Sequence, residues 1–169
     1  MAGPRNHKDP SQQPRRDSTY EQHVDDPYLA RGKLKEPTAC PDCGAVFRNG
    51  RWQWSAAPAG AHSHRCPACS RIHDKAPAAQ LTLSGEFYRG HRDEIMSLVH
   101  NTEEKEKQEH PLERIMAVDE ATNEPGVVIS YTGIHLAKST GNAVHHAYQG
   151  QFEFEYTDRD SVLRLSWQR

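Results

Sequence analysis

Two pairs of cysteines constrain this chain more than any other feature of its sequence. Each pair, Cys40 with Cys43 and Cys66 with Cys69, encloses two residues, and 22 residues separate the pairs. A turn of this kind directs both sulfur atoms toward one point, and two such turns supply the four thiolates of a closed tetrahedral zinc site. The spacing therefore predicts one structural zinc ion with no free coordination position for catalysis.

Two disulfides, a redox-active cysteine pair and an iron site are the alternative interpretations of these cysteines. The first residues contain no apolar segment typical of a secretory signal, and no apolar run is long enough to cross a bilayer. We therefore expect a cytoplasmic protein without a membrane partner. In that reducing compartment, paired cysteines bind metal more often than they form disulfides.

A zinc-ribbon module is expected over residues 28–80. Asn49-Gly50 predicts a tight hairpin, because both residues tolerate a positive φ. The alternation after this turn would place Trp52 and Trp54 on one face of the returning strand. Residues 1–27 combine prolines and polar residues with almost no aliphatic side chains, so we expect a disordered tail there.

The remainder of the chain predicts a long helix followed by a small sheet. Residues 81–111 are expected to form a connecting helix with Ser84 as its N-cap. Residues 112–169 alternate as strand, strand, helix, strand and strand. The sequence thus predicts an α+β fold: a four-cysteine zinc ribbon, a long connecting helix and a C-terminal ββαββ antiparallel sheet domain. A further short strand at Leu81–Leu83 would give a ferredoxin-like order.

The charge of the chain is unevenly distributed. Residues 37–80 carry five Lys and Arg against two Asp and Glu, whereas residues 112–169 carry five against eight. A basic zinc module can contact phosphates, and tryptophans can stack on bases. The candidate nucleic-acid-binding residues are Arg48, Arg51, Trp52, Trp54, Arg65 and Arg71. An ordinary solvated surface, with both tryptophans used for packing, is the alternative.

These features favour a non-enzymatic zinc-binding protein associated with RNA or a ribosome, whose acidic C-terminal domain contacts a protein partner. A protein-only adaptor or regulator is the second interpretation. The third is an enzyme with an unrecognised site near His73 and Asp74. The chain contains no phosphate-binding loop, no dinucleotide glycine fingerprint and no nucleophile elbow, which lowers the expectation of catalysis.

Several segments resemble an uncharacterised proteobacterial zinc-ribbon family over residues 28–167. The segments are RGKLKEPTACPDCG from Arg31, RWQW from Arg51, CPACSRIHD from Cys66 and LTLSGE from Leu81. Members of that family have been labelled ATPases, but no nucleotide-binding motif in this chain supports such an activity. A weaker resemblance is to the archaeal and eukaryotic large-subunit export adaptor of nonsense-mediated decay nomenclature. That resemblance implies a ribosomal partner, although this chain lacks the additional cysteines and domains of those adaptors.

Overall fold

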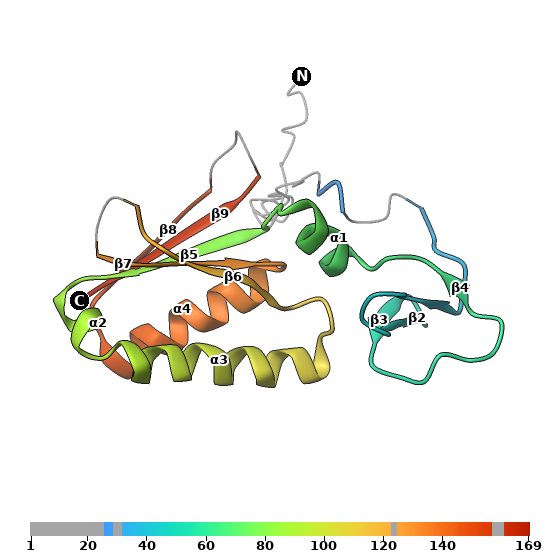
Figure 1. Ribbon diagram of the computed structural model, residues 1–169, viewed down its shortest axis with the longest axis horizontal. Coiled ribbons are helices and arrows are strands. Elements are labelled where there is room, and N and C mark those ends of the chain that lie inside the picture. Colours follow the sequence, from blue (N-terminus) through green and yellow to red (C-terminus); the bar gives the residue numbers. More distant parts are fainter. Residues whose placement is uncertain (1–25, 29–31, 123–124, 157–160) are drawn as a thin grey trace, which may run out of the picture.

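A computed structural model describes residues 26–28, 32–122, 125–156 and 161–169. Figure 1 shows two sheets lying side by side along the long axis. The smaller sheet has the order β3-β2-β1-β4. Its strands are β1 (Thr38–Ala39), β2 (Val46–Arg48), β3 (Arg51–Gln53) and β4 (His62–Ser63). Helix α1 (Pro67–Asp74) follows. We call β1 to β4 with α1 the ribbon module.

The larger sheet has the order β6-β7-β5-β9-β8. Its strands are β5 (Ala79–Ser84), β6 (Ile115–Glu120), β7 (Gly126–Tyr131), β8 (Gln151–Tyr156) and β9 (Leu163–Gln168). Helices α2 (Glu86–Gly90), α3 (Arg92–Glu109) and α4 (Ile134–Tyr148) accompany it. Figure 1 shows α3 and α4 beneath one face of this sheet. We call β5 to β9 with α2 to α4 the sheet domain, and the chain has the predicted α+β fold.

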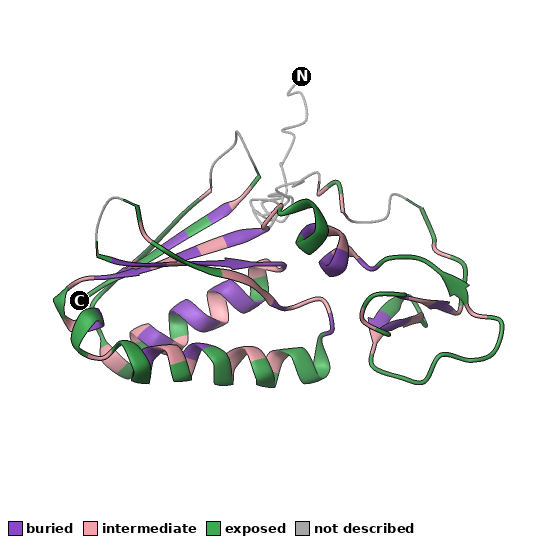
Figure 2. Cartoon of the chain, in the orientation of Figure 1, coloured by how far each residue is buried: buried purple, intermediate pink, exposed green. Residues whose placement is uncertain are grey.

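The main hydrophobic core lies between this sheet and the helices. Leu81 of β5, Ile129 of β7 and Trp167 of β9 are buried on the helix-facing side. Ile95 of α3 and Leu136 of α4 pack into the same core. Figure 2 shows buried residues on α4 and along the central strands, while much of α3 is exposed. Because α3 contributes to this core, it is a layer of the sheet domain and not a free linker.

Strand β5 is the largest difference from the sequence-based expectation. The short segment considered at Leu81–Leu83 is a six-residue strand at the centre of the sheet, and the expected boundary after residue 80 falls inside it. It pairs antiparallel with β7 and parallel with β9. Strands β6, β7 and β5 follow a ferredoxin-like order, but β9, the second strand of the final hairpin, takes the place beside β5. The expected four-stranded ββαββ sheet therefore has a fifth, central strand.

The expected connecting helix is divided in two. Ser84 ends β5 and is not an N-cap, and a break at His91 separates α2 from α3. Gly85 has φ of +102°, and a Cβ added there would collide with the carbonyl oxygen of Arg169. The close approach of the C-terminal strand thus explains why the chain turns at Gly85 before the helix begins. No helix in the described part of the chain is long and apolar enough to span a bilayer.

Candidate metal centre and adjacent groove

The four cysteines converge on one point of the ribbon module. One ligand atom from each of Cys40, Cys43, Cys66 and Cys69 lies within 4.8 Å of the other three. The Sγ atoms of Cys43 and Cys66 are 3.8 Å apart. This matches the sulfur–sulfur edge of about 3.8 Å in a tetrahedron whose metal–sulfur bonds are about 2.3 Å. The donor set and its spacing therefore fit one tetrahedrally coordinated ion.

Local backbone geometry positions the two pairs. After β1, the N–H of Gly44 donates to the Cys40 carbonyl at 2.9 Å, and Gly44 has φ of +79°. Cys66 is the N-cap of α1, and its Sγ accepts a hydrogen bond from the N–H of Cys69 at 3.4 Å. The N–H of Cys66 in turn donates to Cys40 Sγ at 3.3 Å. A tight turn and a helix N-terminus thus direct amide hydrogens toward the sulfurs, which stabilises thiolates.

Burial and hydrogen bonding act in opposite directions on these thiols. Burial raises the pKa of Cys40, but backbone N–H groups, that of Cys66 foremost, lower it to about 7. Burial dominates at Cys66 and raises its pKa. Burial is also the main cause that raises the pKa of Cys69, against hydrogen bonds including one from Arg114. A bound cation would supply the charge that the buried thiolates need.

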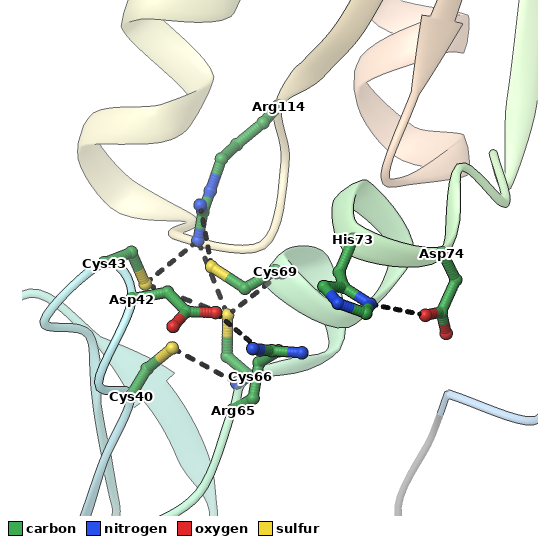
Figure 3. Close-up of polar contacts among 9 residues, drawn as sticks. All are labelled: Cys40, Asp42, Cys43, Arg65, Cys66, Cys69, His73, Asp74 and Arg114. Atoms are coloured by element: carbon green, nitrogen blue, oxygen red, sulfur yellow. Dashed lines mark hydrogen bonds and ion pairs between the residues drawn. The ribbon is translucent and has the colours of Figure 1, made fainter.

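Arg114, which precedes β6, completes the centre from the sheet domain. Figure 3 shows its guanidinium directed at the cysteine cluster. It donates to Cys43 at 3.2 Å, Cys69 at 3.4 Å and Cys66 at 3.5 Å. Burial alone would lower the pKa of Arg114, but the hydrogen bonds to Cys69 and Cys43 raise it above its ordinary value. This residue could not be predicted from the sequence, because no local pattern places it beside cysteines that lie 45 to 71 residues earlier.

The six candidate nucleic-acid residues do not form one surface. Arg48 and Arg51 are exposed and face each other across the β2–β3 hairpin. Trp52 is buried against Phe47, with 9% of its surface exposed. Trp54 is 40% exposed, and its indole N–H donates to the Lys107 carbonyl at 2.6 Å. Trp54 therefore joins the ribbon module to α3.

The other two arginines in this set already have acidic partners. Arg65 is exposed and pairs with Asp42 at 2.5 Å. Arg71 is buried and pairs with Asp26 at 2.6 Å, and its guanidinium lies 4.5 Å from the Tyr28 ring centroid. Asp26 belongs to the expected tail over residues 1–27, so the end of that segment contacts α1, while residues 1–25 lie outside the described residues. Arg71 is consequently a structural residue of α1.

A groove of about 1000 Å³ runs between the ribbon module and the sheet domain. Arg51, Trp52 and Arg65 line it from the ribbon module, and Leu112 and His135 line it from the sheet domain. Its other ionisable lining residues are Tyr28, Lys33, His64, Asp74, His110 and Glu113. Aromatic surface and basic groups thus meet in one concave site.

The histidine–aspartate pair of the enzyme hypothesis lies at the end of α1. His73 Nδ1 is 2.8 Å from Asp74 Oδ1, and both side chains are about half exposed or more, at 65% and 49%. A hydrogen bond from His73 is the main cause that lowers the pKa of Asp74. Asp74 lines the groove, whereas His73 is not among its lining residues. The pair alone does not assemble a catalytic constellation in the described residues.

Comparison with protein-family models, curated proteins and solved structures finds no match to this chain. The two family resemblances therefore remain predictions. What the described residues establish is an α+β fold with a four-cysteine, metal-competent cluster and an adjacent groove.

Proposed function

We propose that this protein is a non-enzymatic zinc protein that binds a single RNA strand in the groove beside its metal centre. Four thiolates at tetrahedral spacing are the donor set of structural zinc sites. Zinc would contribute folding free energy to a module whose own core is small, because the buried cluster around the metal centre comprises Cys40, Cys66, Cys69, two alanines and Trp52. The zinc ion thus serves to build one wall of the groove.

The observation that carries RNA binding is that Arg51 and the partly exposed rings of Tyr28 and Phe47 line this groove together. Proteins that hold single strands combine basic groups that follow the phosphates with aromatic surfaces for the bases. The groove offers Tyr28 and Phe47, both partly exposed, as aromatic surfaces, and Lys33 and Arg51 as cations. A concave site also suits an unpaired strand better than a duplex, whose grooves must receive a protruding element.

Arg48 provides a matched control for Arg51. The two residues are directly opposite in the β2–β3 register, yet only Arg51 lines the groove. Replacing either by alanine removes the same charge from the same hairpin. The zinc-loaded full chain should bind a fluorescein-labelled single-stranded RNA, measured by anisotropy over a series of salt concentrations. We expect Arg51→Ala to weaken binding and reduce the salt slope by about 1, and Arg48→Ala to do clearly less.

Two results would contradict RNA binding in the groove. The first is an absence of binding at low salt, where phosphate contacts are strongest. The second is an equal loss of affinity for Arg48→Ala and Arg51→Ala, which would indicate nonspecific attraction to the hairpin. Absence of binding would favour the protein-only adaptor, whose partner would contact the acidic C-terminal part of the chain.

A further inference from the structure

We propose that Arg114 is an outer-sphere ligand of the metal centre, and that the bound ion thereby holds the ribbon module on the sheet domain. The ion would then determine the relative position of the two units as well as the fold of the smaller one. This inference goes beyond RNA binding and does not depend on it.

Arg114 contacts most of the metal-ligating cysteines, although it is not itself a ligand. Its two terminal nitrogens reach three of the four sulfurs at 3.2 to 3.5 Å. Figure 3 shows the side chain entering the cluster from the opposite side to the ribbon strands. Residues that hydrogen-bond to metal ligands commonly orient those ligands and tune the affinity for the ion. Arg114 occupies that position for Cys43, Cys66 and Cys69 together.

The guanidinium is held in this direction by the sheet domain. Its Nε–H donates to the Pro111 carbonyl at 2.7 Å. The Arg114 N–H donates to Thr132 Oγ1 at 2.8 Å, and the Thr132 N–H donates to the Arg114 carbonyl at 2.9 Å. Because Thr132 directly follows β7, the sheet fixes the base of the side chain. Little conformational entropy remains to be lost when the guanidinium meets the sulfurs.

The contact between the Arg114 guanidinium and the cysteine sulfurs depends on the metal centre because of charge. Arg114 is 9% exposed, and no carboxylate forms an ion pair with it anywhere in the described ranges. A buried guanidinium requires an anionic partner. Four thiolates around one Zn²⁺ leave two negative charges in excess, so the arginine and the zinc–thiolate cluster neutralise each other in part. Without the ordered cluster, the buried cation has no compensating charge.

Few other contacts join the two units in the described parts of the chain. Leu112 is the sheet-domain side chain that packs against the cysteine cluster's hydrophobic core. Trp54 adds its hydrogen bond to the Lys107 carbonyl, and its ring centroid lies 6.0 Å from the Arg114 guanidinium carbon. Both contacts require the ribbon module to be folded. Loss of the ion should therefore release the ribbon module from the sheet domain.

The proposal is tested on the zinc-loaded full chain with Arg114→Gln, and with Arg92→Gln as the control. Arg92 is an exposed arginine of the same domain, on α3. Competition with a chromogenic chelator measures zinc affinity, and ¹⁵N relaxation measures the rotational correlation time of each unit. We expect Arg114→Gln to lose about 10- to 100-fold in zinc affinity. Its ribbon resonances should also show a shorter correlation time than those of the sheet domain.

Arg114→Lys should give an intermediate result, because lysine keeps the charge but lacks the planar fork that reaches several sulfurs. Arg92→Gln should match the wild type in both measurements. The proposal is wrong if Arg114→Gln retains the wild-type zinc affinity, or if its two units still tumble as one body. Should that variant fail to fold, the wild-type chain stripped of zinc decides instead. If its ribbon resonances keep the correlation time of the folded sheet domain, the ion does not hold the units together.

Discussion

Replacing Gly141 by alanine should destabilise the protein, although the same change usually stabilises a helix. Gly141 lies in the interior of α4 and is buried. In a helix interior, alanine is favoured over glycine by about 1 kcal/mol. Here, however, the new Cβ would lie 2.5 Å from Phe152 Cζ and 2.6 Å from its Cε2. Ordinary carbon contacts are about 3.5–4.0 Å, so the ring would have to move by about 1 Å.

The ring of Phe152 is not free to make that movement without loss. It packs against the main core and stacks on His145, with the ring centroids 6.0 Å apart. Inserting a methyl group into such a contact costs about 1–3 kcal/mol. After the gain in helix propensity, we expect a net loss in the free energy of unfolding of up to about 2 kcal/mol. In a Phe152→Leu background the clashing ring atoms are absent, so Gly141→Ala should become stabilising.

Urea unfolding of zinc-saturated protein, followed by circular dichroism, measures the free energy of unfolding. It thereby shows whether Gly141→Ala destabilises the wild type and stabilises the Phe152→Leu variant. The four proteins of the cycle give a coupling free energy, which we expect to be about 1–3 kcal/mol. Gly90→Ala is the control, because an added Cβ there has no heavy atom within 4 Å. A stabilising Gly141→Ala in the wild-type background, or a coupling near zero, would refute the close packing of α4 on β8.

Four further outcomes follow from the metal centre and the N-terminus of α4. Zinc removal by a chelator should unfold the ribbon module but preserve the near-ultraviolet signal of Trp167, which lies in the separate main core. Cys66→Ser should lower zinc affinity and produce the same partial unfolding at limiting zinc. Glu113 accepts a hydrogen bond from the Leu136 N–H at 2.8 Å, so Glu113→Ala should lower the free energy of unfolding by about 1 kcal/mol at acidic pH. Burial raises the pKa of Glu113 above 4.5, so its stabilising contribution should be lost as the pH rises through the folded-state value. The stability of wild type relative to Glu113→Gln, measured by urea unfolding, should consequently be greater in acid than at neutral pH.

The sequence was most informative where the determinants are local. The cysteine spacing predicted the cluster, and Asn49-Gly50 forms the expected hairpin with φ of 55° and 75°. The helix expected between the two pairs of strands in residues 112–169 is α4, and Gly150 follows it with a positive φ. Each of these features depends on a few neighbouring residues, which a single sequence displays directly.

The features that sequence reasoning missed depend on distant parts of the chain. Only Leu81–Leu83 of β5 was considered as a strand, and the central place of β5 follows from pairing with β7 and β9, which lie far along the chain. The cysteine partners of Arg114 lie in the ribbon module, which only the folded chain places beside the segment that precedes β6. Trp54 had two interpretations, and its hydrogen bond to Lys107 favours packing. Such contacts are absent from local patterns because nothing near these residues encodes their partners.

The parallel pairing of β5 with β9 has a consequence for the order in which this chain acquires structure during synthesis. Both neighbours of β5 emerge long after it does, and the N–H of Phe87 finally bonds the Arg169 carbonyl at 2.8 Å. The cysteines, by contrast, are all available once residue 69 has emerged. A nascent chain can therefore capture its ion while Leu81 and Leu83 still lack a sheet to cover them. During that interval the central strand is an apolar segment without its pairing partners, a state in which strands are prone to pair with other chains.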